Sequence, residues 1–227
     1  MDVLVNAAMS ADGKLSTVRR EQVAISGPED FARVDRLRAG SDAVAVGVGT
    51  VLADDPRLTV KDANLVERRR EAGEPAQPAR VVADSRARTP PDARVLDDDD
   101  APTYLLVSEA ADPERLETLR GPGVEAVVAG EGRVDLERAL AALADSGVAD
   151  LMVEGGGELV FSFFEAGLVD RLSTFVGPQL IGGRDAPTLA DGDGFLDRFP
   201  DLELADVDRL DGGVVLHWTV GGRPEKR

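Results

Sequence analysis

Short apolar runs recur along most of this chain, and several lead into a segment whose apolar residues fall at helical spacing. Short runs bounded by turn residues are typical of buried strands, and a spacing of i, i+3, i+4 and i+7 is typical of an amphipathic helix. Strands that alternate with helices predict an α/β fold with a mostly parallel central sheet flanked by helices. The predicted strands are residues 3–9, 42–48, 80–83, 103–107, 124–128 and 151–153.

Helices are predicted where a capping residue precedes such a spacing. An S-x-x-E capping box begins at Ser26 and precedes Phe31, Val34 and Leu37. By contrast, residues 67–78 are charged and interrupted by Gly and Pro, which predicts a solvated surface excursion. The other predicted helices lie between Gly49 and Pro56, over residues 113–119 after an N-cap at Asp112, over residues 136–143, and directly after the glycines at 155–157.

The pattern changes after Gly167. Residues 172–176 read as a strand, and residues 202–210 and 214–220 follow with no helix between them, which predicts a C-terminal antiparallel hairpin. No linker divides the chain, so we expect one domain over residues 1–220. The tail from Gly221 to the end is expected to be disordered.

Composition narrows the chemistry. The chain has no cysteine and one histidine, His217, which excludes thiolate metal sites, Cys nucleophiles and a His-rich metal centre, so we predict no metal site. We assign His217, in the last predicted strand, to packing. The net charge of −17 argues against nucleic acid as a partner and favours a protein that stays dispersed in a salt-rich cytosol. With no signal peptide and no apolar run of about 18 residues, a cytoplasmic protein without membrane contact is expected.

The stretch Asp150–Phe164 is the main candidate for ligand binding. Its apolar strand leads through Glu154 to three glycines and then to a helical pattern. Glycines let the backbone approach a ligand, and the first amides of a helix attract phosphate. The stretch matches neither a complete dinucleotide fingerprint nor a Walker loop, so a tight turn without a ligand remains an alternative.

Polar residues also follow three other predicted strands, at the edge where open α/β sheets bind ligands. Ser10, Asp12 and Lys14 crowd one strand end, although Asp-Gly sequences favour turns in any case. Thr50 and Asp54 lie one helical turn apart. Arg86 and Arg88, in the sequence Asp84-Ser85-Arg86-Ala87-Arg88-Thr89, suit a phosphomonoester, with exposed arginines on a turn as the alternative.

Three blocks together resemble the reductase domain of riboflavin biosynthesis. They are Ser10–Lys14, the sequence GVGTVLADDPRLTVK over Gly47–Lys61, and VEGGGELVFSFFEAGLVDRL over Val153–Leu172 followed by GPQLIGG. The resemblance covers about residues 3–220 and includes the ADSRART strand end. It implies a fold similar to dihydrofolate reductase, NADPH as cofactor and a homodimer. It also implies reduction of the ribose of a phosphoribosylamino-pyrimidine to a ribityl chain by hydride transfer to C1′.

The resemblance also assigns roles by position. Asp12 would lie between the two ligands, with Asp12 and Glu154 as candidate acids and Lys14 as their charge partner. Lys61 stands where many bacterial members carry Arg, which keeps a charge for phosphate and removes the bidentate fork. The implied cofactor contacts are Thr50, Asp54, Ser85, Arg86, Gly155, Gly156, Gly157, Glu158 and Leu159, and the implied substrate contacts are Ser10, Ser26, Leu58, Lys61 and Glu154.

In many bacteria this reductase is fused to a zinc deaminase with an H-x-E and P-C-x-x-C signature. Since this chain has no cysteine, it resembles the stand-alone archaeal and fungal type, which reduces the 2,5-diamino-pyrimidinone before deamination. Two other enzymatic readings stay open, namely a reductase for the deaminated uracil and one for another pterin or pyrimidine. A third is a non-catalytic NADP-binding sensor.

Overall fold

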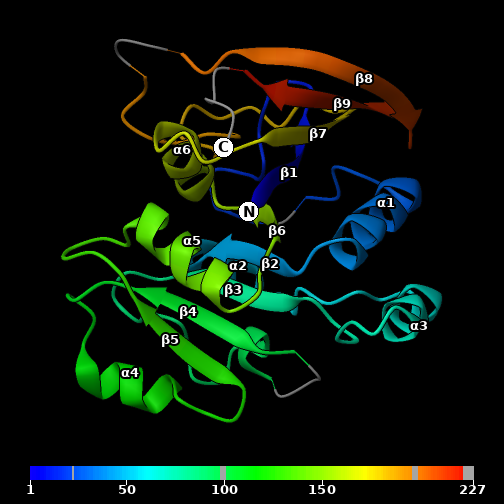
Figure 1. Cartoon of the computed structure of the whole chain (residues 1–227). Coiled ribbons are helices and arrows are strands. Elements are labelled where there is room, and N and C mark those ends of the chain that lie inside the picture. Colours follow the sequence, from blue (N-terminus) through cyan, green and yellow to red (C-terminus); the bar gives the residue numbers. More distant parts are fainter. Residues whose placement is uncertain (22, 98–100, 196–198, 222–227) are drawn as a thin grey trace. The chain divides into compact units, whose positions relative to one another are not determined.

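The computed structural model describes residues 1–21, 23–97, 101–195 and 199–221 (Figure 1). The chain forms two compact units. The first consists of Ala32–Met152 together with Met1, and the second consists of Asp2–Phe31 and the chain from Val153 onward. The single domain expected over residues 1–220 stays a prediction, and residues 222–227 of the tail lie outside the described part.

The first unit is built on a parallel sheet, which Figure 1 shows in cyan and green. Its valine-rich strands pair in the order in which they occur in the sequence, as their short apolar runs predict. Buried Val46, Val82 and Leu105 lie in the core of this unit. The strands are β2 (Ala43–Gly47), β3 (Ala79–Ala83), β4 (Thr103–Val107) and β5 (Val124–Val128).

Aspartates are the N-cap residues of several helices in the first unit. The side chains of Asp62, Asp112 and Asp135 accept hydrogen bonds from the backbone N–H groups of Asn64, Glu114 and Arg138, which satisfies donors that the helix leaves unpaired. The predicted N-cap at Asp112 is therefore confirmed. The helical elements are α2 (Val48–Asp54), α3 (Ala63–Glu71), the 3₁₀ turn η1 (Arg94–Leu96), α4 (Pro113–Leu119) and α5 (Leu136–Asp145).

Helix α3 corrects one prediction. Most of the surface excursion expected over residues 67–78 is exposed, but residues up to Glu71 are helical and Arg69 is buried. Arg69 explains the difference: only 5% of it is exposed, and its guanidinium donates to the carbonyl oxygens of Ala39, Ser41 and Pro75. A charged residue here has a buried structural role, which a polar sequence pattern does not indicate.

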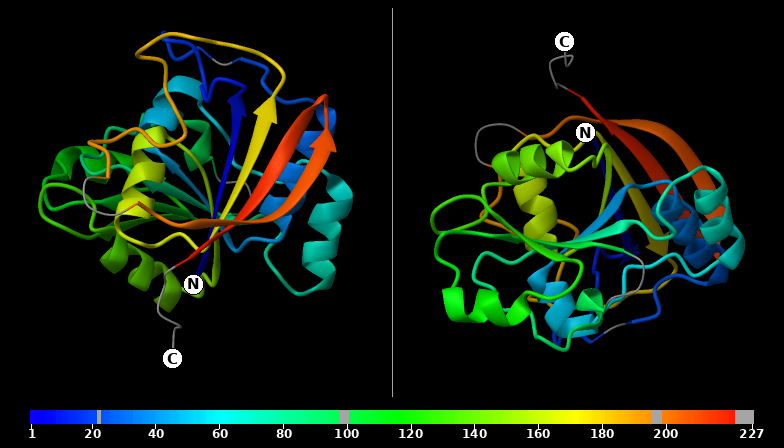
Figure 2. Two further views of the ribbon diagram at one scale, coloured as in Figure 1. Left: turned by 90° about the horizontal axis from the view of Figure 1, so that it is seen from above. Right: turned by 60° about the horizontal axis from the view of Figure 1, so that its bottom comes forward.

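The second unit combines segments from both ends of the chain. Figure 2 shows its strands side by side in the left view, in blue, yellow, red and orange. β1 (Asp2–Ser10) pairs in parallel with β7 (Arg171–Gly177), which pairs antiparallel with β9 (Gly213–Val220). β9 then pairs antiparallel with β8 (Leu202–Leu210), so the predicted hairpin is confirmed.

Two elements cross the border between the units in sequence, namely α1 (Pro28–Ala39) and β6 (Asp150–Gly155). The capping-box pattern predicts α1 well in extent but misassigns one side chain. Val34 and Leu37 pack against the core of the first unit, whereas Phe31 is 61% exposed. Buried polar residues of this helix, such as Asp30 and Asp35, take the inward positions instead.

Helix α6 (Gly157–Glu165) completes the second unit, with Phe163 fully buried. This helix is largely apolar, but its nine residues are too few to cross a membrane. Across the residues that the structure describes, no helix has the length and apolar character that a membrane span requires.

Candidate functional site

The glycine stretch folds as predicted, from strand through turn to helix. β6 ends at Gly155, Gly156 is the N-cap residue with φ 90°, and α6 begins at Gly157. Gly156 needs glycine because other residues are disfavoured at this φ. Gly157 needs it for space, since a Cβ there would lie 2.5 Å from Oδ2 of Asp191. The start of α6, with no side-chain cap at Gly156, is suited to an anionic ligand.

A loop over residues 187–195 lies against this turn. The N–H of Asp191 donates to the carbonyl oxygen of Gly157 at 3.0 Å. The carboxylate of Asp191 is turned to Thr188, whose N–H and Oγ1 both donate to it. The ring of Phe195 packs against Phe161 of α6, with 4.9 Å between centroids. The loop therefore braces the first turns of α6 from the side.

Asp12 lies in the turn after β1 and is held as a carboxylate. Oγ of Ser10 donates to its Oδ1 at 2.6 Å, and the backbone N–H groups of Ile181 and Gly182 donate to its two oxygens. These hydrogen bonds, with Ser10 first, lower the pKa of Asp12 from 3.8 to about 2. Asp12 is thus ionised near neutral pH and does not serve there as a proton donor.

Two other predicted residues of this turn have structural partners. Ser10 is fully buried, and its Oγ also accepts from the N–H of Lys14 at 2.9 Å. The Nζ of Lys14 donates to the carbonyl oxygen of Ala186 at 3.0 Å, at the start of the loop that braces α6. The role of Lys14 as charge partner of Asp12 and Glu154 stays a prediction.

The capping role predicted for Ser26 is wrong. Helix α1 begins at Pro28, and its first amides donate to the carboxylate of Asp211, which lies 182 positions after Glu29 in the sequence. Ser26 is half-buried just before this helix start, and Glu154 is half-buried on β6. Both remain predicted contacts of the substrate.

In the first unit, α2 carries Thr50 and Asp54 one helical turn apart, as predicted, and both are half-buried. The chain then turns through two residues with positive φ, Asp55 at 42° and Leu58 at 57°. Leu58 is only 2% exposed and packs in the core, so its main chain alone can face a ligand. Such backbone strain in a bulky residue persists where the surrounding structure over-determines it, often near a binding site.

Lys61 is exposed, and its backbone is held in place. Both carboxylate oxygens of Asp35 accept from the N–H of Lys61 at 2.9 Å, and one accepts from Asp62. The exposed Lys61 side chain therefore starts from an anchored backbone, and its contact with the substrate stays a prediction.

The ADSRART turn after β3 is the second candidate anion site. The buried carboxylate of Asp84 accepts from both N–H and Oγ1 of Thr89 at 2.7 Å. Ala87 is buried with φ 54°, and Nε of Arg115 donates to its carbonyl oxygen. This rigid turn leaves Arg86 exposed at its outer side, with Arg88 exposed two positions later.

Ser85 of the same turn is partly engaged. Its Oγ accepts from the N–H of Val134 at 3.1 Å, and its carbonyl oxygen accepts from N–H and Oγ of Ser108. The hydroxyl proton of Ser85 remains available to a ligand in this arrangement.

Sequence reasoning missed the carboxylates that hold these segments, namely Asp35, Asp191 and Asp211. Asp35 and Asp211 accept backbone N–H groups of residues far away in the sequence. Asp191 accepts from the nearby Thr188 and braces the distant turn at Gly157. The pair Asp211-Gly212 signals only a turn in the sequence. No spacing rule could have connected it with Ser26.

A model of the family described as the RibD C-terminal domain matches residues 2–216. The chain belongs to this family. The resemblance to the reductases of riboflavin biosynthesis is thereby confirmed.

Two archaeal proteins match this chain over nearly its full length. The chain is 50% identical over 214 residues to the 2,5-diamino-6-ribosylamino-4(3H)-pyrimidinone 5′-phosphate reductase of Archaeoglobus fulgidus, covering 94% of this chain and 95% of that protein. It is 47% identical over 223 residues to the reductase of the same name from Methanothermobacter thermautotrophicus, covering 97% and 98%.

A solved structure supports the fold. The pyrimidine reductase-like protein of Corynebacterium diphtheriae superimposes with a TM-score of 0.85 at 19% identity, over 98% of this chain and 92% of that one. Together with the parallel pairing and the C-terminal hairpin, this confirms the predicted dihydrofolate-reductase-like α/β fold.

Proposed function

We propose that this chain is an NADPH-dependent reductase of 2,5-diamino-6-ribosylamino-4(3H)-pyrimidinone 5′-phosphate in riboflavin biosynthesis. The observation that carries this proposal is the identity of 50% and 47%, over nearly the full length, to two archaeal reductases of that name. Both relatives are named for the diamino substrate, which favours this substrate over its deaminated counterpart for this chain.

The residues present fit a dinucleotide. Gly156 and Gly157 leave no Cβ at the start of α6, where a diphosphate would be held by backbone N–H groups. Thr50, Asp54 and Ser85 are proposed as further contacts of the cofactor, and Arg86 as the contact of the 2′-phosphate that distinguishes NADPH from NADH. When bound, the dinucleotide supplies the hydride for C1′ of the ribose.

The protein contributes binding, charge and a proton. Reduction of a ring-opened sugar, present as an imine at C1′, adds a hydride to carbon and a proton to nitrogen. The low pKa of Asp12 makes it a permanent negative charge that would stabilise a protonated imine. We assign proton delivery to Glu154, which is half-buried on β6 directly before the glycine turn. Ser10, Ser26, Leu58 and Lys61 are assigned to the substrate.

The test follows NADPH oxidation with three substrates: the diamino-pyrimidinone ribosylamine phosphate, its deaminated uracil counterpart, and dihydrofolate. We expect the first to give the highest kcat/KM. Preference for the second or third would assign the chain to one of the alternative reductases. Binding of NADPH without turnover of any of them would identify a sensor.

We further propose that the chain acts as a homodimer in the cytoplasm, where its phosphorylated ligands are retained. An exposed apolar strip on the hairpin supports a dimer: Leu202, Leu204 and Val207 of β8 are 41%, 49% and 46% exposed. Register places them opposite Val220, Trp218 and Leu216 of β9, on the same face. Leu204→Glu should convert the dimer to a monomer in light scattering; an unchanged mass would contradict this use of the strip.

A further inference from the structure

We propose that Asp211 is a positioning residue for the pyrimidine substrate, acting through the segment that carries Ser26. This inference rests on the proposed function, because it takes Ser26 as a substrate contact. Asp211 lies in the turn between β8 and β9, far in sequence from every residue assigned to the substrate. Its side chain binds the start of α1.

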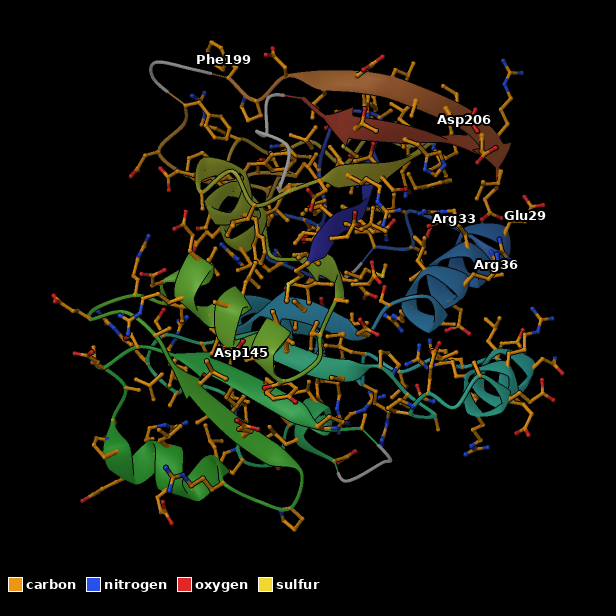
Figure 3. All side chains as sticks on the ribbon, viewed as in Figure 1. Glu29, Arg33, Arg36, Asp145, Phe199 and Asp206 are labelled. Atoms are coloured by element: carbon orange, nitrogen blue, oxygen red, sulfur yellow. The ribbon has the colours of Figure 1, made fainter. Side chains whose placement is uncertain are left out.

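The contact is a reciprocal helix cap made across the fold. Oδ2 of Asp211 accepts from the N–H groups of Gly27 at 3.1 Å and Asp30 at 2.7 Å, and Oδ1 accepts from the N–H of Glu29 at 3.2 Å. The N–H of Asp211 donates in return to Oε2 of Glu29 at 2.8 Å. Figure 3 labels Glu29 at this end of α1. The arrangement is a capping box whose two halves come from different elements.

Packing makes this contact specific. A Cβ on Gly27 would lie 2.6 Å from Oδ1 of Asp211, so only glycine permits the approach. Asp211 itself has φ 50°, a conformation that Asp tolerates better than most residues. The two residues therefore depend on each other's shape as well as on the hydrogen bonds.

The residue on the other side of Ser26 is anchored as well. Ile25 is 7% exposed and packs with Phe175 and Val215 in a core cluster of the second unit. A Cβ on Gly177 would lie 2.5 Å from the carbonyl oxygen of Ile25, so the backbones of these two residues are in close contact. Ser26 is thus held between Ile25 in the core and Gly27 on Asp211.

This arrangement also assigns the start of α1 a structural role. Since the Asp211 carboxylate takes the amides, a phosphate would compete with an internal anion there. What the cap provides is a fixed position for the half-buried Ser26. Small misplacement of a binding group lowers affinity even when the group itself is intact.

The experiment compares Asp211→Ala and Asp211→Asn with Asp208→Ala as a matched control. Asp208 is an exposed carboxylate of β8 that contacts His217 on the neighbouring strand. We expect Asp211→Ala to raise the KM for the diamino-pyrimidinone substrate about tenfold, with kcat and the KM for NADPH within about twofold. Asp211→Asn, which retains one acceptor oxygen, should recover part of the loss, and Asp208→Ala should match wild type.

A double-mutant cycle with Ser26→Ala identifies the route. If Asp211 acts through Ser26, the double variant should have about the same KM as Ser26→Ala alone. Additive effects, an unchanged KM in either single variant, or an equal rise in the KM for NADPH would overturn the inference. Each variant is assayed well below its own unfolding temperature, so that lost stability is not read as lost affinity.

The proposed function fails in a different way. If the wild-type chain neither turns over nor binds the diamino-pyrimidinone substrate in calorimetry, both the function and this inference are overturned. Turnover by wild type with no change in Asp211→Ala would overturn the inference alone.

Discussion

Two helices of this protein begin beside an aspartate from a distant loop, and the two aspartates do different things. At α1, the carboxylate of Asp211 accepts the first amides directly. At α6, the carboxylate of Asp191 lies beside Gly157 but accepts from Thr188, and the N–H of Asp191 donates to the carbonyl oxygen of Gly157. The same residue type caps one helix start and braces the other, where we propose that the diphosphate of the cofactor binds.

The comparison teaches that a helix start is an anion site only when the protein has not already supplied the anion. Both starts have glycine near the cap and an acid in the first turn, Glu29 in α1 and Glu158 in α6. Local sequence therefore cannot distinguish them. The difference lies in where a remote carboxylate points.

The largest effect is expected from adding a methyl group at each start. Gly157→Ala would push against Asp191 and the carbonyl oxygen of Thr188, and should raise the KM for NADPH more than a hundredfold. Gly27→Ala would push against Asp211 and should raise the KM for the pyrimidine while sparing NADPH. Circular dichroism would confirm that both variants are folded. Equal effects on both ligands would remove the distinction.

The next effect separates chemistry from binding at the α6 start. Glu154 lies directly before the glycines. Glu154→Gln keeps the shape and removes the acid, so kcat should fall about a hundredfold or more while the dissociation constant of NADPH, measured by fluorescence, stays within about twofold. An unchanged kcat would contradict a role for Glu154 in proton delivery.

A smaller effect tests the brace at α6. Asp191→Ala removes the acceptor that orders the loop beside Gly157, and should raise the KM for NADPH about tenfold with little change in the KM for the pyrimidine. Asp193→Ala changes an exposed carboxylate of the same loop and serves as the control. If both variants behave alike, the loss reflects loop charge and not the brace.

Arg86 tests whether the first unit supplies cofactor specificity. Arg86→Ala should narrow the preference for NADPH over NADH several-fold, because one cation near the 2′-phosphate is lost and Arg88 remains. The ratio of kcat/KM for the two cofactors is the measurement. Equal losses with NADPH and NADH would argue against a 2′-phosphate contact.

The smallest effect concerns Asp12 and pH. Its pKa of about 2 in the folded chain lies below its ordinary value of 3.8, so the ionised form is favoured by folding. That stabilisation is present above about pH 4 and is lost as pH falls through about 2. Asp12→Asn should lower the Tm slightly at pH 7, with the difference shrinking toward pH 2. A difference that grows in acid would contradict the assignment.

Much of the fold follows from local pattern. Apolar runs predict the strands because a buried strand needs little else, and Asp112 predicts its helix because an N-cap acts within one turn. The pattern fails at α3 and at Phe31 for one reason. Arg69 and Asp35 are buried with main-chain partners, so polarity there does not report exposure.

The sequence by itself determined the strands, most of the helices, the glycine turn before α6 and the family, because each depends on residues that are neighbours in the chain or on a long shared pattern. Only the tertiary structure decided that Asp211 caps α1, that Asp191 braces α6 and that Asp12 is held ionised by Ser10, Ile181 and Gly182. Most of these contacts join groups more than a hundred positions apart, and a hydrogen bond depends on distance in space.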